Sequence, residues 1–202
     1  RYKQRACLFP VASRTLQGMI GAAFAKWPTM EAPPVLGYLE SDADGSGVSV
    51  YQQAQSTTAA VLRNGRAGLL VDFPESDGQL TVADMQSGAI RANILAYSAE
   101  QIINWRTERV GAINRLVLVV LREVVHEPGE YGVTAVNQWR ELRLVDGVYT
   151  VRLWRRNERS GLEMVSESFP RQSSGALWTE IPFAFVGAMN NDTEIDNAPM
   201  MD

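Results

Sequence analysis

The sequence is poor in the residues that most often build metal sites and disulfides. Its 202 residues include one cysteine, Cys7, and one histidine, His126. A single cysteine excludes an internal disulfide framework, and one cysteine with one histidine supplies too few soft ligands for a zinc site. We therefore expect no bound metal, no cofactor and a reducing compartment.

Common enzyme motifs are absent as well. The sequence contains neither a G-x-S-x-G nucleophile elbow nor a P-loop. A catalytic role for His126, which lies beside Glu123 and Glu127, would require a nucleophile and an orienting group within hydrogen-bond reach. We predict that the chain is not an enzyme and has no catalytic residue. The alternative is an enzyme of unrecognised type encoded by a prophage, such as a hydrolase built around His126.

Long apolar runs and a positive net charge are also missing. The longest apolar runs, at residues 116–121 and 181–186, are far shorter than the roughly 20 residues that span a bilayer. The net charge is −4, whereas counterion release drives most DNA binding by basic proteins. We therefore expect no membrane contact and no sequence-specific recognition of DNA.

One acidic segment resembles a calcium-binding loop. Asp42, Asp44, Ser46 and Gly47 occupy positions 1, 3, 5 and 6 of that loop. Position 12 is Gln53 in place of the bidentate glutamate that the ion needs. We interpret residues 42–47 as a solvated turn.

Helical patterns dominate the first half of the sequence. An apolar stripe between residues 11 and 27 predicts an amphipathic helix that packs against a core or a neighbouring subunit. A second helix is expected over residues 48–63, because Asn64-Gly65 supplies a left-handed stop. Ser98 and Gln101 form a capping box, which predicts a short helix up to Trp105. Further short helices are expected at residues 1–8 and 81–84. The stripe consists of Leu16, Met19, Ile20, Ala23, Phe24 and Trp27.

Strand patterns dominate the second half. Residues 138–144 and 148–154 alternate about Asp146-Gly147, which is the strongest short-range signal for an antiparallel hairpin. Other strands are expected at residues 67–73, 92–97, 116–125, 163–168 and 181–186. A helical N-terminal half followed by a β-rich half predicts an α+β fold class.

One basic cluster offers a possible contact with a partner or with nucleic acid. It consists of Arg152, Trp154, Arg155, Arg156 and Arg159. Arginine next to an aromatic residue can pair with phosphates and stack on bases. Because Glu158 and Glu163 reduce the local positive charge, a solvated hairpin end or a charged protein contact is the favoured interpretation.

Several stretches, taken in order, carry a family resemblance. They are Arg14-Thr15-Leu16-Gln17-Gly18 with residues 24–28, RNGRAGLLVDFP at residues 63–74, YSAEQIINW at residues 97–105, residues 138–144 with Asp146-Gly147-Val148-Tyr149, and Ile181-Pro182-Phe183 through Asn191. Their order and spacing resemble the N-terminal half of a family of bacteriophage portal-like proteins, long known only as a domain of unknown function.

The resemblance implies a structural subunit of a ring, usually of twelve copies, at one vertex of the phage capsid. Such a homo-oligomer assembles in the bacterial host cytoplasm and becomes part of the virion. It forms the DNA entry and exit channel, contacts double-stranded DNA without sequence preference, and docks the packaging terminase, the capsid and the head-to-tail connector.

On this resemblance the chain divides into three parts of a longer polypeptide. Residues 1–105 are expected to form a helix-rich, wing-like region, and residues 106–189 a β-rich region of the wing or the clip. Residues 190–202 are expected to be a linker toward a stem helix. A monomeric module that binds capsid or scaffold protein is the remaining alternative.

Overall fold

The computed structural model describes residues 10–73, 91–129, 132–157, 161–172 and 175–187. The helices in these ranges are α1 (Val11–Ala23), η1 (Pro34–Glu40), α2 (Val50–Asn64) and η2 (Ala99–Gln101). The strands are β1 (Ala67–Asp72), β2 (Asn93–Ser98), β3 (Ile102–Val110), β4 (Ile113–Gly129), β5 (Gly132–Val145), β6 (Val148–Asn157), β7 (Gly161–Ser168) and β8 (Phe183–Val186). The helices expected at residues 1–8 and 81–84, and the linker at 190–202, lie outside the described residues.

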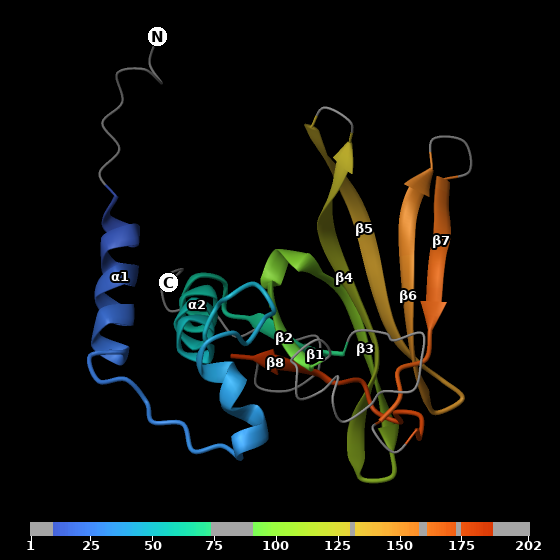
Figure 1. Ribbon diagram of the computed structural model, residues 1–202, viewed down its shortest axis with the longest axis horizontal. Coiled ribbons are helices and arrows are strands. Elements are labelled where there is room, and N and C mark those ends of the chain that lie inside the picture. Colours follow the sequence, from blue (N-terminus) through green and yellow to red (C-terminus); the bar gives the residue numbers. More distant parts are fainter. Residues whose placement is uncertain (1–9, 74–90, 130–131, 158–160, 173–174, 188–202) are drawn as a thin grey trace.

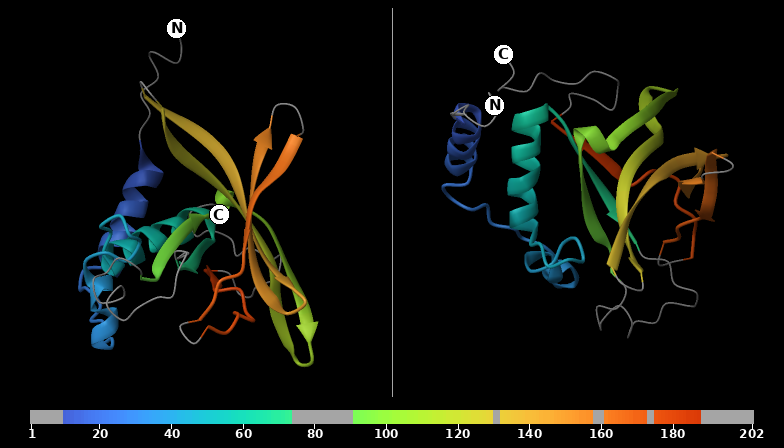
Figure 2. Two further views of the ribbon diagram at one scale, coloured as in Figure 1. Left: turned by 45° about the vertical axis from the view of Figure 1, so that its right-hand side comes forward. Right: turned by 90° about the horizontal axis from the view of Figure 1, so that it is seen from above.

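The strands form two antiparallel sheets. The three-stranded sheet has the order β2-β1-β8, and the five-stranded sheet has the order β3-β4-β5-β6-β7. Figure 1 shows α1, α2, the three-stranded sheet and the five-stranded sheet in that order across the molecule, and Figure 2 shows the same layers from above. α2 therefore covers one face of the three-stranded sheet, and the five-stranded sheet covers the other.

The hydrophobic core lies between the two sheets. Leu70 and Phe183 from the three-stranded sheet meet Leu121 and Leu142 from the five-stranded sheet. The rest of the core cluster is Tyr97, Ile102, Leu116, Val119, Tyr149, Val151 and Ile181. Burial of this apolar surface is the main force that holds the sheets face to face.

The predicted α+β arrangement, with a helical first half, is wrong. About half of the described residues are in strands and about a quarter are in helices. β1 and β2 both lie in the first half, and β1 also pairs with β8 near the end of the chain. Helical periodicity is a local signal, whereas this sheet joins segments more than one hundred residues apart, which local patterns do not reveal. β3 crosses residue 105, and the proposed division into regions 1–105 and 106–189 stays a prediction.

The helix expected up to Trp105 is a further correction. Ser98 and Gln101 do form both hydrogen bonds of a capping box, but η2 ends at Gln101 and β3 begins at Ile102. Ile102 and Ile103 are β-branched, and such side chains favour an extended backbone. The capping box therefore starts a single turn, which the following sequence does not continue.

The predicted stop of α2 and the β5–β6 hairpin agree with the structure. Gly65 ends α2 at a φ of 74°. The helix begins at Val50, two residues later than predicted, because Ser49 caps it in a capping box with Gln52. Asp146 and Gly147 have φ values of 51° and 79°, as a two-residue hairpin turn requires. The hairpin register begins with Val145 opposite Val148.

α1 is shorter than predicted and ends at Ala23. It has no buried residue, Leu16 and Ile20 are partly buried, and the helix lies against α2. The ring of Trp27 lies 6.1 Å from that of Tyr51 on α2. Much of the predicted apolar stripe is therefore open to further contacts.

Candidate functional site

β6 distributes the predicted basic cluster over two faces. Arg155 shares its face with Val151, which belongs to the core, because side chains two and four residues apart lie on the same side of a strand. Arg152, Trp154 and Arg156 lie on the opposite face, called here the outer face of the five-stranded sheet. Arg159 lies outside the described residues. The five residues therefore do not form one surface.

Carboxylates neutralise two of these arginines within the chain. Nε of Arg152 lies 2.7 Å from a carboxylate oxygen of Glu167, and Nη1 of Arg155 lies 2.6 Å from one of Glu127. Nε1 of Trp154 donates to Glu141 at 2.8 Å. The cluster as predicted from sequence thus carries less free charge than its arginine content suggests.

The outer face also contains a row of residues that the sequence analysis did not connect. Arg122 on β4 lies opposite Trp139 on β5, Trp139 lies opposite Trp154 on β6, and Trp154 lies opposite Met164 on β7. The row crosses four neighbouring strands. Half of it could have been found from sequence, because extending the Asp146-Gly147 hairpin register places Trp139 opposite Trp154.

A polar network on the core side joins the two sheets. Tyr97 Oη donates to Glu123 at 2.6 Å. Arg140 binds Glu123 through Nε at 2.8 Å and Asp72 through Nη1 at 3.1 Å. The side chains of Arg140 and Glu123 are 18% and 13% exposed. Because Asp72 and Tyr97 belong to the three-stranded sheet, these contacts fix how one sheet lies on the other.

Burial has a large effect on the tyrosines of this network. Desolvation, with the charge of Glu123 adding to it, raises the pKa of Tyr97 far above its ordinary value. Burial likewise raises the pKa of Tyr149. The guanidinium of Arg140 loses hydration, but the negative charges around it outweigh that loss and raise its pKa. Both tyrosines are therefore neutral and Arg140 is charged at physiological pH.

These shifts predict how stability depends on alkaline pH. A tyrosine with a raised folded-state pKa stays protonated where the unfolded chain already ionises, so folding binds more protons. The contribution of these tyrosines to the free energy of unfolding should be constant below about pH 10 and fall as the pH rises further. The decrease in the free energy of unfolding between about pH 8 and about pH 11, measured by urea unfolding at both, should be smaller in Tyr97→Phe than in the wild-type chain. The control is Tyr51→Phe on α2. If Tyr97→Phe lost as much stability between these pH values as the wild-type chain, Tyr97 would not be a source of the pH dependence.

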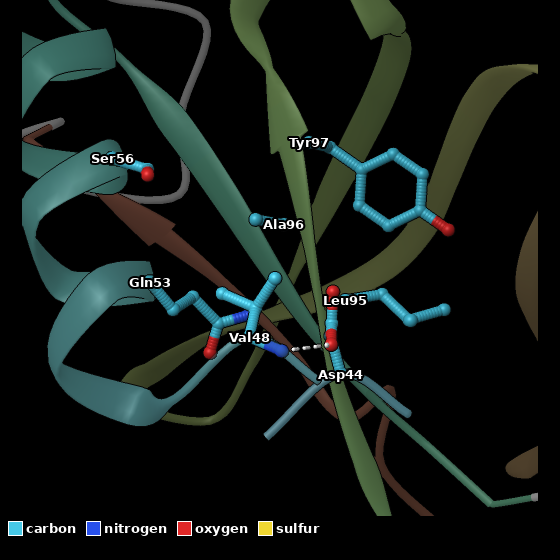
Figure 3. A pocket seen from close by; sticks show the side chains of 7 residues that line it. All are labelled: Asp44, Val48, Gln53, Ser56, Leu95, Ala96 and Tyr97. Carbon is cyan, nitrogen blue, oxygen red and sulfur yellow. Dashed lines mark hydrogen bonds between the residues drawn. The ribbon is translucent and has the colours of Figure 1, made fainter. Parts of the chain in front are cut away.

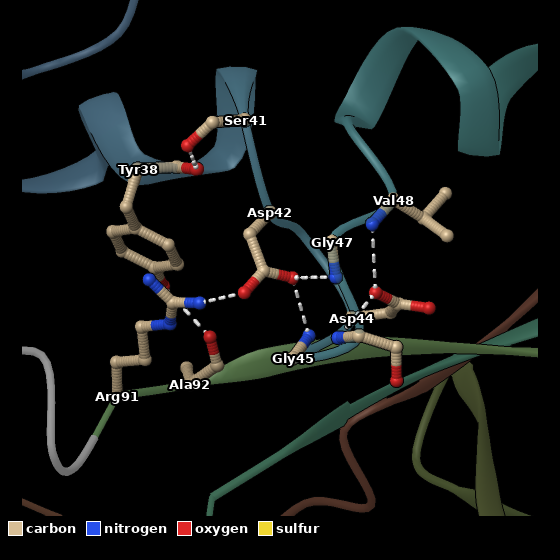
Figure 4. A network of polar contacts seen from close by, with 10 residues as sticks. Tyr38, Ser41, Asp42, Asp44, Gly45, Gly47, Val48, Arg91 and Ala92 are labelled. Carbon is tan, nitrogen blue, oxygen red and sulfur yellow. Dashed lines mark hydrogen bonds and ion pairs between the residues drawn. The ribbon is translucent and has the colours of Figure 1, made fainter.

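The loop between η1 and α2 is the predicted turn. Asp42 Oδ1 accepts hydrogen bonds from the backbone N–H groups of Gly45 and Gly47 at 2.8 and 2.9 Å. Asp44 Oδ1 accepts from the N–H of Val48 at 3.2 Å, and Asp42 also pairs with Arg91 (Figure 4). The bond from Gly47, with smaller effects of Arg91 and Gly45, holds the pKa of Asp42 below its ordinary value.

A pocket of about 380 Å³ lies between this loop, α2 and β2 (Figure 3). Its polar side chains have partners nearby: Ser56 donates to the carbonyl of Gln52 at 2.9 Å, Gln53 donates to that of Ile94, and Tyr97 donates to Glu123. The pocket is lined by Asp44, Val48, Gln53, Ser56, Leu95, Ala96 and Tyr97. The bond from Gln53 joins α2 to β2, and the polar side chains of the lining do not converge on one point.

His126 lies within β4, opposite Ala135 on β5, and is exposed. Sequence neighbours Glu123 and Glu127 point to the other face of the strand, where they bind Arg140 and Arg155. The structure thus separates His126 from the carboxylates that adjoin it in sequence. A hydrolase centre on His126 would need its partners from another chain or from residues outside the described ranges.

Comparison with known proteins adds no further assignment: no protein-family model matches the chain, and no curated protein is detectably similar to it. Among the described residues, no group of three or more histidine, cysteine, aspartate or glutamate side chains is placed to hold a metal ion. Within the same residues, no helix is both long and apolar enough to span a membrane.

Proposed function

We propose that this chain is part of a structural subunit of a phage portal ring and is not an enzyme. In this proposal it belongs to a longer polypeptide whose copies, usually twelve, surround the DNA channel at the capsid vertex. The terminase, the capsid and the connector are its proposed partners. The proposal rests on the family resemblance of the sequence and on surfaces suited to contacts between subunits.

The observation that carries the proposal is a two-stranded ribbon at the end of β4 and β5. Six residue pairs, from Val124 opposite Asn137 to Gly129 opposite Gly132, have no third strand beside them among the residues that the structure describes. Val124 and Val133 are 54% and 67% exposed. Isolated two-stranded ribbons are marginally stable in water, so a ribbon of this length gains most from packing against another subunit.

One face of the ribbon is suited to such packing. The residues on the face of Val124 are His126, Pro128, Val133, Ala135 and Asn137, which carry no charged side chain when His126 is neutral. The opposite face carries Glu127, paired with Arg155. On the side of α2 away from the sheets (Figure 1), α1 exposes Val11 and Met19. Copies arranged head to tail could cover both surfaces, and head-to-tail contacts generate rings when the rotation closes.

Assembly state tests the proposal. Association costs several kcal/mol of rigid-body freedom, which part of an interface does not offset. We expect this chain alone to remain a monomer or a small, weak oligomer, and a polypeptide extended beyond Asp202 to form rings. Light scattering and electron microscopy on both would show the difference. An extended chain that stayed monomeric over a wide concentration range would contradict a portal and favour a monomeric module that binds capsid or scaffold protein.

A matched pair of variants tests the ribbon within the extended chain. Val133→Lys places a charge on the uncharged face and should weaken the rings. Thr134→Lys adds the same charge on the next residue, which faces the other side, and should leave them intact. If the two variants formed rings equally well, the uncharged face of the ribbon would not be part of the contact between subunits.

A further inference from the structure

We propose that the outer face of the five-stranded sheet binds single-stranded nucleic acid without sequence preference. Trp139 and Trp154 would stack on bases, and Arg122 and Arg156 would pair with phosphates. The inference rests on side chains of this sheet alone and does not depend on the portal proposal. The proposed site differs from the basic cluster predicted from sequence: it includes Arg122 and Trp139, and it does not include Arg152 and Arg155.

The two tryptophans are placed side by side by strand register. Trp139 and Trp154 are directly opposite each other on β5 and β6, and Cβ atoms of such pairs are about 5 Å apart. Both side chains are half-buried, so each keeps part of its ring surface open. Adjacent aromatic residues on a sheet form a platform on which successive bases of a single strand can stack.

The charges of the outer face divide into a neutralised set and a free set. Arg143 lies 2.7 Å from Glu141, and Arg152 lies 2.7 Å from Glu167. Arg122 and Arg156 are exposed, and neither forms an ion pair or side-chain hydrogen bond with another described residue. Two positive charges therefore remain available beside the tryptophans, in a chain of net charge −4.

The positions of these two arginines suit a ligand that has both flat rings and negatively charged groups. Arg122 lies opposite Trp139 at one end of the row, and Arg156 is two residues beyond Trp154 on the same face of β6. Leu162, opposite Arg156, and Met164, opposite Trp154, add exposed apolar surface at 54% and 46%. An acidic peptide would use only the two charges, whereas a single-stranded nucleic acid would use the charges and the rings.

The test uses the whole 202-residue chain and a labelled single-stranded oligonucleotide of about 15 nucleotides. Binding should appear by fluorescence anisotropy at low salt, with quenching of tryptophan fluorescence. Arg122→Gln with Arg156→Gln should weaken it and lower the dependence of log K on log salt by about 1.4, or about 0.7 for each lost phosphate contact. Trp139→Leu should weaken binding by about tenfold, the equivalent of a stacking contact of about 1.4 kcal/mol.

The matched control is Arg106→Gln with Arg109→Gln on β3. These exposed arginines are outside the row, and their removal changes the net charge by the same amount. This control should bind as the wild-type chain does. A loss equal to that of the Arg122 and Arg156 pair would overturn the site and leave only a general charge effect.

Two competitors test the class of ligand. A duplex of the same sequence should compete less well than the single strand, because its bases are already stacked, and a poly-glutamate peptide should compete weakly. Equal competition by either ligand, or wild-type affinity in Trp139→Leu, would overturn the stacking platform.

Circular dichroism should confirm that each variant is folded, and the arginine pair decides the question if Trp139→Leu unfolds. Ring formation by the extended chain is a separate readout, so this inference and the portal proposal can fail independently.

Discussion

Replacing Gly68 with alanine is expected to lower the free energy of unfolding by about 3 kcal/mol. A Cβ atom at this position on β1 would lie 2.2 Å from Cζ of Phe183 and 2.9 Å from Cδ1 of Ile102. Phe183 is 7% exposed, and its ring is held 5.1 Å from that of Phe185 and 6.4 Å from that of Tyr97. The ring has little room to move, so the added methyl group strains the core.

Urea unfolding of Gly68→Ala beside Gly21→Ala would measure this effect. Gly21 is in α1, where an added Cβ meets nothing within 4 Å, and alanine in a helix is favoured over glycine by roughly 0.5–1 kcal/mol. The control should therefore be neutral or slightly stabilised. A second change, Phe183→Leu, should recover part of the loss in Gly68→Ala. Equal midpoints for Gly68→Ala and the wild-type chain would show that Phe183 does not lie over Gly68.

Removal of Arg140 should have the second large effect. Arg140→Leu leaves Glu123 and Asp72 without their shared cation, and breaking a buried ion pair from one side typically costs about 3–5 kcal/mol. Because the side chain of Asp72 is 33% exposed and that of Arg140 is 18% exposed, solvent screens part of the loss. We expect a decrease of about 2–4 kcal/mol in the free energy of unfolding.

Two further variants separate the network from a general charge effect. Arg106 and Glu108 form an ion pair in which both side chains are more than half exposed, so Arg106→Gln should change stability by less than about 0.5 kcal/mol. Arg140→Lys keeps the charge but not the planar fork that reaches two carboxylates, and should fall between the wild-type chain and Arg140→Leu. If Arg140→Leu were as stable as Arg106→Gln, the network would not join the sheets.

The elements that sequence patterns predicted correctly are those whose signals lie within a few residues. Gly65 ends α2 because glycine adopts a positive φ without strain. The Asp146-Gly147 turn sets the register of β5 and β6, because both of its residues adopt the positive φ that a two-residue hairpin turn requires. Other strands were found with their ends misplaced: β4 was expected at residues 116–125 and spans Ile113–Gly129. Its additional residues form hairpin ends, whose exposed side chains do not give a buried-strand pattern.

The elements that patterns missed depend on contacts between distant segments. β3 was taken for the end of a short helix, since Ser98 and Gln101 are a local helix signal. Its extended form brings pairing with β4 and places Ile102 in the core, and these gains are not visible in a window of ten residues. The placement of β8 beside β1 is of the same kind, because it brings together residues 67–70 and 183–186.

The sequence by itself determined the residue types at the candidate site, the turn that pairs β5 with β6, and the net charge of −4. Tertiary structure alone decided which of the arginines are paired with carboxylates: it brought Glu167 to Arg152 and Glu127 to Arg155, and it set Arg122 beside Trp139 from another strand. The reason is physical. Alternation along one strand assigns each side chain to a face, but the partner of a charge on that face comes from neighbouring strands, and their register depends on the whole sheet.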